Sequence, residues 1–355
     1  MIVLGSTGSI GVNTLNIARK FNLNVEVLVA GNNIELLNKQ IEEFKPKYVV
    51  IANKEDISKV SHTNVQAGQE AILQVIENSE AQTVVNALVG FLGLRPTLKA
   101  IECGKKIALA NKESLVVAGK FIDQTKLSPI DSEHFGLWYL LQDRKISSMT
   151  ITASGGSFRD YPLNELSKVS IKEALNHPNW SMGNKITIDS ATMTNKMFEL
   201  IEAAWLFDTR KVDAIIETKS LIHAMVNFED GSTTAHIANA SMQLPIAYAI
   251  LGKCDENILE PVDLLKVGSL EFRAIEEERY PIWQVKDKIL NNLDLGVVLN
   301  AANEVAVAKF LDSKIGFLDI SKITLKALDK FSDASANSID EIFNIDKEVR
   351  KYCES

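Results

Sequence analysis

The stretch MIVLGSTGSIG, residues 1–11, contains the pattern that decides the fold. A short apolar run (1–4) leads into Gly5, Gly8 and Gly11, and an amphipathic stretch follows from Val12. Glycines at a turn between a strand and a helix let backbone N–H groups approach a pyrophosphate at the helix N-terminus. Such a turn can also be merely structural, but its position before a second strand favours dinucleotide binding.

Apolar runs of strand length alternate with helix-patterned stretches over the first 120 residues. The runs lie at 1–4, 25–30, 48–51, 83–88 and 106–110. Strands that are apolar throughout, separated by amphipathic helices, are typical of a parallel, doubly wound sheet. We therefore predict a Rossmann-like N-terminal sheet.

The pattern changes after residue 147. Strand-like runs at 147–153, 212–217, 225–232 and 233–238 predict a central α/β domain with an open sheet face that a second subunit could cover. Residues 252–283 are irregular. Helical patterns from about 285 onward, including 296–311 and 319–331, predict a C-terminal helical bundle.

Composition narrows the class of protein. The 355 residues include 38 basic and 46 acidic side chains, a net charge of −8, which argues against a nucleic-acid partner. Three widely spaced cysteines predict reduced thiols in the cytoplasm and neither a disulfide framework nor a zinc site. We find no apolar run long enough for a membrane span and expect no signal or transit peptide.

The end of the second predicted strand favours NADP over NAD. Residues 30–33 read AGNN, with no carboxylate where an NAD enzyme usually binds the ribose 2′-hydroxyl. Nothing there would repel a 2′-phosphate. The alternative is an ordinary polar turn.

The stretch SPIDSEHFG, residues 128–136, brings two acids together. Pro129 favours an extended segment, in which Asp131 and Glu133 would point to the same side. Two carboxylates aimed together repel each other unless a cation lies between them. Hard divalent ions such as Mg²⁺ and Mn²⁺ prefer such oxygen ligands. Taken alone, the two acids would more often be solvated loop residues.

Residues 187–207 predict a helix that begins near Ser190, a good N-cap residue. Asn195, Lys196 and Glu199 would share one face of this helix. A hydroxyl, an amide and an ammonium at the positive end of a helix suit a phosphate, and Glu199 could supply a third metal ligand. The alternative is a solvated Lys–Glu pair at i,i+3.

Two loops and one strand end complete the predicted site. Small residues at 154–156 would let a ligand approach the backbone. The segment 177–183 would act as a lid, with Trp180 shielding the substrate, although a loop pinned by a buried Trp fits equally. Asn111, Lys112 and Glu113 follow the last strand of the first domain, which places them near the nicotinamide.

Together these stretches resemble one family along nearly the whole chain. GSTGSIG (5–11), NKESLV (111–116), PIDSEHFG (129–136), ASGG (153–156), HPNWSMGNKITIDSATMTNKMFE (177–199) and LNAANEVAVAKFL (299–311) are similar to motifs of the 1-deoxy-D-xylulose 5-phosphate reductoisomerases. The resemblance implies conversion of 1-deoxy-D-xylulose 5-phosphate to 2-C-methyl-D-erythritol 4-phosphate, in non-mevalonate isoprenoid precursor biosynthesis. It also implies NADPH, Mg²⁺ or Mn²⁺ (with Co²⁺ as an alternative), a cytoplasmic homodimer and no membrane partner.

The resemblance also implies a division of the chain. The implied parts are an NADPH-binding domain (1–131), a catalytic and dimerisation domain (132–252), a linker (253–283) and a C-terminal helical domain (284–355). The expected chemistry is a rearrangement by retro-aldol cleavage and re-addition, followed by reduction of the resulting aldehyde with NADPH.

Matching positions carry the family's site onto this chain. The implied metal ligands are Asp131, Glu133 and Glu199, which with Lys112 form the catalytic group. The implied substrate contacts are Lys112, Ser132, Glu133, Ser154, His177, Ser190, Asn195, Lys196 and Glu199. The implied cofactor contacts are Thr7, Gly8, Ser9, Ile10, Gly31, Asn32, Asn33, Asn111, Glu113 and Gly183.

Two departures from the family pattern stand out. Asn32 occupies a position where the family often has a basic residue, which affects the expected contact with the 2′-phosphate. The chain reads ETKS at 217–220 where many members read His-Pro-Gln-Ser, so Glu217 replaces a histidine.

Two other classes of function fit parts of the sequence. A simpler NADP-dependent sugar-phosphate or hydroxy-acid dehydrogenase would need no metal. A non-catalytic NADP-sensing module would bind cofactor without turnover, and its acids could be replaced without chemical consequence. The clustering of polar residues between 131 and 199 favours the metal-dependent enzyme.

Overall fold

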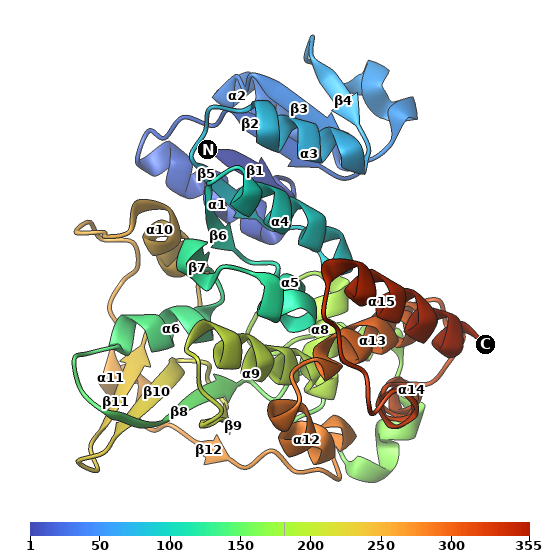
Figure 1. Cartoon of the computed structure of the whole chain (residues 1–355). Coiled ribbons are helices and arrows are strands. Elements are labelled where there is room, and N and C mark those ends of the chain that lie inside the picture. Colours follow the sequence, from blue (N-terminus) through green and yellow to red (C-terminus); the bar gives the residue numbers. More distant parts are fainter. Residues whose placement is uncertain (181) are drawn as a thin grey trace. The chain divides into compact units, whose positions relative to one another are not determined.

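The computed structural model describes residues 1–180 and 182–355. The chain forms two compact units, drawn together in Figure 1. The first comprises Met1–Ser114, Ile122–Asp131 and Ser241–Leu259, and the second comprises Leu115–Phe121, Ser132–Ala240 and Glu260–Ser355. The segment 241–259, expected in the central domain and linker, thus belongs to the first unit.

The first unit is built on a parallel sheet of seven strands in the order β4-β3-β2-β1-β5-β6-β7. This confirms the predicted Rossmann-like sheet, and five of the strands match the five apolar runs. The strands are β1 (Ile2–Leu4), β2 (Val27–Ala30), β3 (Tyr48–Ile51), β4 (Val65–Ala67), β5 (Thr83–Asn86), β6 (Lys106–Leu109) and β7 (Leu127–Pro129).

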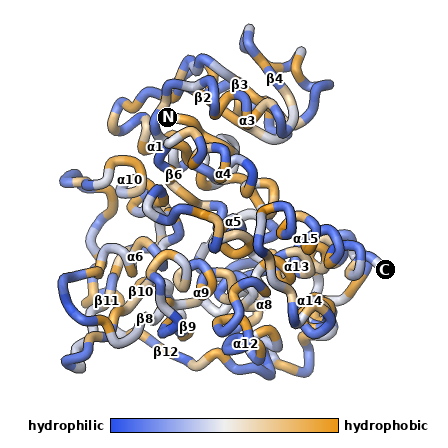
Figure 2. Tube along the Cα trace, in the orientation of Figure 1, coloured by the Kyte–Doolittle hydropathy of each residue, from blue (hydrophilic) through white to orange (hydrophobic). Residues whose placement is uncertain are grey.

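Helices flank this sheet and connect its strands. The strands β1 and β2 are buried at every residue, as expected of strands covered on both faces. Figure 2 shows the alternation of hydrophobic and hydrophilic residues along the helices of this unit. The α-helices are α1 (Ser9–Lys20), α2 (Ile34–Phe44), α3 (Gln69–Asn78), α4 (Leu94–Glu102) and α10 (Gln243–Leu251), and the short 3₁₀ helices are η1 (Lys54–Lys59), η2 (Gly90–Gly93) and η4 (Gln124–Lys126). Helix α5 (Lys112–Ala118) begins in this unit and continues into the second.

The second unit contains a mixed sheet of five strands in the order β11-β10-β8-β9-β12. Helices α6 (Ser132–Leu140) and α9 (Thr194–Leu206) pack against strands of this sheet and against each other. The strands are β8 (Ile146–Ala153), β9 (Val212–Glu217), β10 (Ile222–Phe228), β11 (Thr233–Ile237) and β12 (Phe272–Arg273).

The helical region of the second unit surrounds one buried helix. Helix α13 (Leu295–Leu311) packs against α14 (Phe317–Lys330), α15 (Ile339–Glu354) and α8 (Asn184–Thr192). Its residues 300–303 are all buried, because neighbours cover it on several sides. This confirms the predicted C-terminal bundle. The remaining helical segments are α7 (Ile171–Ala174), α11 (Leu264–Val267), α12 (Lys286–Asn291), η3 (Gly119–Phe121), η5 (Leu163–Lys168) and η6 (Pro281–Val285).

Among the described residues, no helix combines the length and the apolar character needed to cross a membrane.

Candidate active site

The turn between β1 and α1 cannot accommodate side chains at two of its glycines. Gly5 has φ +85°, and a Cβ there would lie 2.6 Å from the carbonyl oxygen of Ala87. A Cβ on Gly11 would lie 2.2 Å from the carbonyl oxygen of Gly5. Gly8 precedes the helix without a side-chain cap, and it is exposed together with Ser9. Backbone N–H groups at the start of α1 are therefore open to an anion.

Exposed amides follow β2. Asn33 caps α2, because its side chain accepts a hydrogen bond from the N–H of Leu36 at 3.1 Å. Asn32 Oδ1 accepts a hydrogen bond from Asn53 Nδ2 at 3.2 Å. Asn53 follows β3, which pairs in parallel with β2. The structure thus puts two amides at the edge where the cofactor's ribose is expected.

Asn111 is 1% exposed and anchors a loop. Its Nδ2 donates to the carbonyl oxygens of Leu88 and Gly90, at 2.9 and 2.8 Å. The same nitrogen lies 3.2 Å from Glu113 Oε2. A Cβ on Gly93 would lie 2.3 Å from the amide of Asn111. The structure therefore gives Asn111 a bracing role in the loop that follows β5.

Lys112 and Asp131 form an ion pair within the first unit. Lys112 Nζ lies 2.6 Å from Asp131 Oδ2, and the two side chains are 7% and 14% exposed. The nearly buried ammonium neutralises this carboxylate, whose oxygens are of the type that binds a cation or accepts a hydrogen bond from a sugar hydroxyl.

Glu133 and Glu199 meet within the second unit, around Lys196. Lys196 Nζ lies 3.2 Å from Glu133 Oε1 and also pairs with Glu199 Oε2. One carboxylate oxygen of Glu133 lies within 4.8 Å of one of Glu199. Asn195 Nδ2 donates to Glu199 Oε1 at 2.5 Å, and Ser132 Oγ donates to Glu133 Oε2 at 2.6 Å.

The prediction of an extended segment around the acids was wrong for Glu133. Helix α6 begins at Ser132, so Glu133 lies in its first turn and Asp131 directly precedes the helix. The pattern D-S-E-H contains a helix start, because Asp and Ser favour positions before and at the beginning of a helix. The two acids are nevertheless only two positions apart along the chain.

The donor set of this region fits a hard divalent cation. Glu133 and Glu199 offer carboxylate oxygens, and the ammonium of Lys196 stands between them as a cation would. Both carboxylates are at most 15% exposed, so a cation there would be shielded from most competing water.

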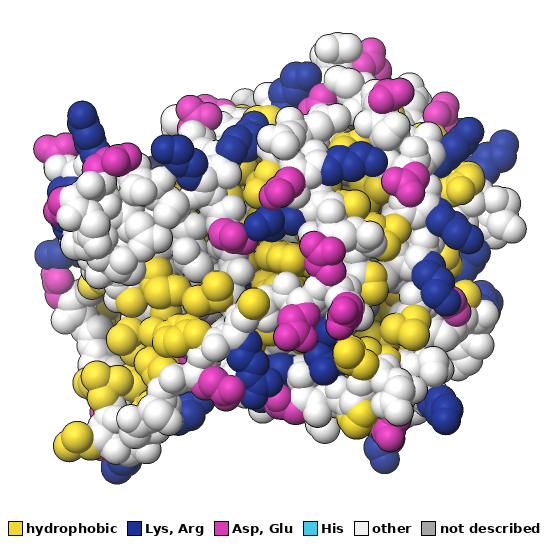
Figure 3. Space-filling model, turned by 90° about the horizontal axis from the view of Figure 1, so that it is seen from below, with side chains coloured by type: hydrophobic (Ala, Val, Ile, Leu, Met, Phe, Trp, Pro, Cys, Tyr) yellow, Lys and Arg dark blue, Asp and Glu magenta, His cyan; other side chains and the backbone are white. Residues whose placement is uncertain are grey.

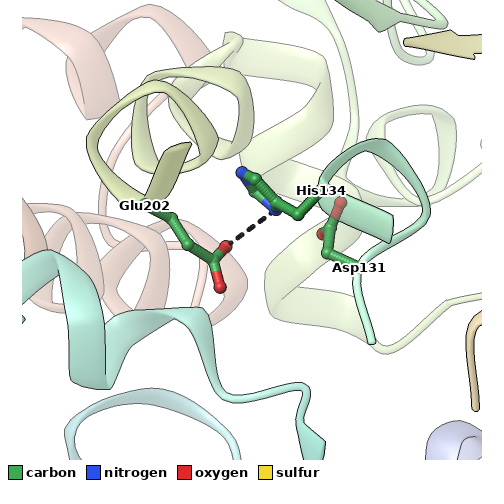
Figure 4. Close-up of side chains that lie close together, drawn as sticks. All are labelled: Asp131, His134 and Glu202. Atoms are coloured by element: carbon green, nitrogen blue, oxygen red, sulfur yellow. Dashed lines mark ion pairs between the residues drawn. The ribbon is translucent and has the colours of Figure 1, made fainter. Parts of the chain in front are cut away.

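A buried pair connects α6 with α9. His134 Nδ1 lies 3.2 Å from Glu202 Oε2, with side-chain exposures of 0% and 1% (Figure 4). His134 Nε2 lies 2.9 Å from the backbone oxygen of Glu199. The imidazole therefore ties the helix that carries Glu133 to the backbone of Glu199.

The predicted helix start at Ser190 was also wrong. Residues 187–206 belong to two helices, α8 and α9, separated by Met193 in the left-handed conformation at φ 67°. Ser190 lies in the last turn of α8, whereas Asn195 and Lys196 lie in the first turn of α9. The predicted phosphate residues thus come from two consecutive helix ends.

His177 joins two of the predicted substrate residues. Its Nε2 lies 2.9 Å from Ser154 Oγ and 3.2 Å from Ser190 Oγ. Gly156 makes this approach feasible, because a Cβ there would lie 2.6 Å from the carbonyl oxygen of Ser190. Its φ of +69° also favours glycine. The structure thus brings together Ser154, His177 and Ser190, which the resemblance implies as substrate contacts.

The ring of His177 is held in one neutral form. Nδ1 accepts from the N–H groups of Asn179 and Trp180, at 3.2 and 2.9 Å. Nε2 therefore carries the proton and can donate to a serine hydroxyl. Burial, with a smaller contribution from the nearby Arg159, lowers the pKa of His177 from its ordinary value of 6.5 to about 4.

The predicted lid, 177–183, includes Ser181, which lies outside the described residues. Trp180 contacts His223 edge to face, with ring centroids 6.2 Å apart. Gly183, a predicted cofactor contact, precedes α8 in the second unit as its N-cap.

Several residues of this region were missed by sequence reasoning. Asn179 and Arg159 hold the loops that carry His177 and Ser154, and Glu202 pairs with His134. Asn303 Nδ2 donates to Asp189 Oδ1 at 2.7 Å, which fastens α8 to α13. Only the position of Asn179 within HPNW and of Asn303 within LNAANE hinted at a role.

A parallel sheet with a glycine turn, combined with a second unit that gathers carboxylates, a lysine and serines, defines a dinucleotide-dependent enzyme acting on a phosphorylated substrate. Comparisons with known proteins agree with this class. The family model for 1-deoxy-D-xylulose 5-phosphate reductoisomerase matches residues 1–119. Models of its C-terminal domains match residues 127–207 and 237–352.

Relatives match the chain along its whole length. The 1-deoxy-D-xylulose 5-phosphate reductoisomerase of Nautilia profundicola is 61% identical over 363 residues, covering 100% of this chain and 99% of that protein. The enzyme of the same name from Wolinella succinogenes is 53% identical over 355 residues and covers 99% of each.

Solved structures agree as well. A crystal structure of DOX-P reductoisomerase in complex with NADPH, fosmidomycin and magnesium matches with a TM-score of 0.94 at 35% identity, covering 99% of this chain and 97% of the other. The Zymomonas mobilis enzyme in complex with NADPH matches with a TM-score of 0.89 at 37% identity and the same coverage. This chain belongs to the 1-deoxy-D-xylulose 5-phosphate reductoisomerase family.

Proposed function

We propose that the protein converts 1-deoxy-D-xylulose 5-phosphate to 2-C-methyl-D-erythritol 4-phosphate, with NADPH and a divalent metal ion, in isoprenoid precursor biosynthesis. The observation that carries this function is the match to family members over the whole chain. The related structures that contain NADPH and magnesium support both cofactors.

The metal ligands are Asp131, Glu133 and Glu199. Support comes from the two carboxylates that meet at Lys196, and from the position of Asp131 beside Glu133 in the chain. A divalent ion would stabilise the negative charge that develops on the substrate oxygens during rearrangement. Mg²⁺ and Mn²⁺ both suit three carboxylate ligands, and Co²⁺ is an alternative.

The residues that the resemblance implies as substrate contacts bind and orient the substrate. Ser190, Asn195 and Lys196 take the phosphate, since a hydroxyl, an amide and an ammonium suit its oxygens. Ser154 and His177 extend this group of donors, with His177 presenting Nε2–H. Lys112 beside Asp131 provides an ammonium that can stabilise an oxyanion or pass a proton to it. Ser132 holds the carboxylate of Glu133.

The first unit binds NADPH. The exposed start of α1, with Thr7, Gly8, Ser9 and Ile10, takes the pyrophosphate, and Gly31, Asn32 and Asn33 lie toward the ribose. Asn111 and Glu113 are assigned to the nicotinamide end, and Gly183 is a further proposed contact. The division into residues 1–131, 132–252, 253–283 and 284–355 is part of this proposal.

We infer that the working form is a homodimer that covers the open sheet face. Ala235 and Ile237 flank His236 on β11, and His236 contacts Phe135 of α6 at 5.3 Å between ring centroids. The alternation of a strand therefore turns Ala235 and Ile237 to the opposite face. Met225 pairs with Ala235 across the sheet, and Ile237 is 41% exposed. Figure 3 shows hydrophobic side chains gathered on the side of the molecule that is seen from below.

The dimer has a direct test. Met225→Lys places a charge in the centre of this face, so sedimentation velocity should give a dimer for the natural protein and a monomer for the variant. A natural protein that sediments as a monomer at micromolar concentration contradicts the proposal.

We also assign the reaction to the cytoplasm, supported by the three thiols, all of which are free.

The activity is tested by mixing the protein with 1-deoxy-D-xylulose 5-phosphate, NADPH and Mg²⁺ and following NADPH absorbance. Absorbance should fall, stop falling on addition of EDTA, and fall again with excess Mg²⁺. Turnover that survives EDTA would instead support a metal-free dehydrogenase. Cofactor binding without turnover would support a sensing module.

A further inference from the structure

Glu217, the last residue of β9, is 0% exposed, and its carboxylate accepts hydrogen bonds from three backbone N–H groups. Its Oε1 accepts from the N–H of Lys219 at 2.8 Å. Its Oε2 accepts from the N–H groups of Leu221 and Ile222, at 2.7 and 3.2 Å. Three backbone donors around one buried carboxylate compensate for its loss of water. The carboxylate thus organises the turn 218–222 between β9 and β10.

This turn contains a strained residue. Ser220 has φ 54°, in the left-handed region that side-chain-bearing residues adopt at a cost. Such a conformation persists only where its surroundings fix it. The N–H groups on both sides of Ser220, those of Lys219 and Leu221, are the ones that Glu217 holds. Glu217 therefore determines where the Ser220 hydroxyl lies.

The turn 218–222 also holds the loop that contains His177. Asn179 Nδ2 donates to Ser220 Oγ at 2.7 Å and to the carbonyl oxygen of Thr218 at 3.1 Å. The N–H of Asn179 donates to His177 Nδ1 at 3.2 Å. The position of the turn is thereby transmitted to the imidazole through a single side chain.

A second connection runs through Arg159. Its guanidinium donates to the carbonyl oxygens of Thr218 and Ser154, at 2.9 and 2.8 Å. Ser154 Oγ and His177 Nε2 are 2.9 Å apart. The turn 218–222 thus supports both the imidazole and the hydroxyl that the substrate is expected to meet.

We propose that Glu217 is a positioning residue for substrate binding, which acts through the turn 218–222 on Asn179 and Arg159 and so on His177 and Ser154. This inference rests on the proposed function of that site. It assigns to Glu217 a structural carboxylate and no contact with substrate. A glutamine offers one acceptor oxygen and adds two donors, so it cannot satisfy the three N–H groups.

The test compares Glu217→Gln with Asp213→Asn. Both changes replace a carboxylate by an amide on β9, but Asp213 is 58% exposed and pairs with the half-buried Lys286. For Glu217→Gln we expect the KM for 1-deoxy-D-xylulose 5-phosphate to rise at least tenfold, which corresponds to about 1.4 kcal/mol. The kcat and the KM for NADPH should stay within about twofold, since neither the carboxylates at Lys196 nor the first unit is touched. Asp213→Asn should leave all three constants unchanged.

Hydrogen exchange provides a readout that does not depend on turnover. In Glu217→Gln the backbone amides of residues 177–180 should exchange faster, along with those of 218–222. Faster exchange confined to 218–222, with unchanged KM, would overturn the proposal and leave Glu217 with a purely local role. A lower melting temperature with unchanged KM would overturn it equally.

Ser220→Ala keeps the test decisive if Glu217→Gln does not fold. This change removes the hydroxyl that binds Asn179 and leaves the carboxylate of Glu217 in place. The KM for 1-deoxy-D-xylulose 5-phosphate should therefore rise in Ser220→Ala without any change at Glu217. If both variants fold, the double variant should raise KM no further than Glu217→Gln alone, because both act on the same connection. Fully additive effects of the two changes on KM, or an unchanged KM for Ser220→Ala, would contradict the positioning role of Glu217. Absence of turnover by the natural protein would instead refute the proposed function.

Discussion

Lys196 Nζ lies 3.2 Å from Glu133 Oε1, although the two residues are 63 positions apart in the sequence. The same ammonium pairs with Glu199, one turn further along α9. A lysine expected at the phosphate thus neutralises the carboxylates expected at the metal. The two roles are compatible, because a divalent ion at Glu133 and Glu199 would replace the ammonium as their counter-charge and leave it to the phosphate.

Lys196→Met should separate these two roles. Without the ammonium, Glu133 and Glu199 have lost a competitor for a divalent ion, so Mn²⁺ should bind the free enzyme more tightly. The substrate phosphate has lost a charged partner, so KM for 1-deoxy-D-xylulose 5-phosphate should rise roughly tenfold to a hundredfold. Calorimetry with Mn²⁺ and steady-state kinetics measure the two effects. An unchanged KM would mean that this lysine serves only the carboxylates.

Glu133→Gln should abolish most metal-dependent turnover while leaving NADPH binding intact. An amide is a weaker ligand for a hard cation than a carboxylate. The kcat/KM should therefore fall by about 100-fold or more, which exceeds the usual loss of activity when a residue that only hydrogen-bonds to a metal ligand is replaced. Asp131→Asn should behave similarly. Titration of Mn²⁺ and of NADPH checks the two halves of the prediction. Near-normal kcat at ordinary metal concentration would remove Glu133 from the ligand set.

Glu277→Gln is a suitable control for that experiment, because this carboxylate is exposed and is not among the residues assigned to the site. Its metal affinity and kcat should equal those of the natural protein. A comparable fall in the control would show that the loss in Glu133→Gln reflects a general effect of the changed charge.

The fold was predictable where the hydrophobic pattern matched the burial of the elements. The run YVVI became β3 with the predicted bounds, 48–51. The edge strands β4 and β7 were missed, because each has only three residues and none of them is fully buried. Short edge strands owe their conformation to their neighbours more than to their own side chains.

Proximity of candidate residues followed more readily from the sequence than their local structure did. Ser154, His177 and Ser190, which the resemblance implies as substrate contacts, lie within hydrogen-bonding distance of one another through His177 Nε2. The break at Met193 was not predicted, since nothing in its side chain favours φ 67°. Nor could the sequence indicate that Glu217 would accept three backbone hydrogen bonds, because those donors come from the turn's own conformation.

Asn32→Lys should strengthen the preference for NADPH over NADH. Asn32 is exposed at the end of β2, next to Asn53. An ammonium there would attract a 2′-phosphate, and one charge-assisted hydrogen bond corresponds to roughly a tenfold change in the ratio of kcat/KM for the two cofactors. Asn78→Lys, which adds the same charge at the exposed end of α3, should leave the ratio unchanged. Equal ratios in all three proteins would place the 2′-phosphate elsewhere.

His177 should stay neutral well below neutral pH. Burial lowers its pKa to about 4, whereas in the unfolded chain it titrates near 6.5. Between these values the unfolded state binds the proton and the folded state does not. The free energy of unfolding should therefore fall as pH decreases from about 6.5 toward 4, by at most ~1.4 kcal/mol per pH unit from this residue.

Two measurements check this behaviour of His177. NMR of the imidazole should show a titration midpoint near the lowered pKa. Urea unfolding at several pH values should show that the free energy of unfolding changes less with pH in His177→Gln than in the natural protein. A midpoint near 6.5 would mean that water reaches the ring and that Nδ1 is not held by the N–H groups of Asn179 and Trp180.

Gly156→Ala should destabilise the protein more than Gly231→Ala. Both glycines have positive φ, +69° and +84°, so both changes incur the left-handed penalty of about 1–2 kcal/mol. Only at Gly156 would the new methyl group meet backbone, 2.6 Å from the carbonyl oxygen of Ser190, whereas at Gly231 nothing lies within 4 Å. Overpacking of this kind costs roughly a further 1–3 kcal/mol.

Because Ser190 must move, Gly156→Ala should also raise KM for the phosphorylated substrate. Urea unfolding measures the stability of the two variants, and steady-state kinetics measures their KM. Equal stabilities for the two variants would show that α8 shifts freely, and that the contact with Gly156 does not fix Ser190.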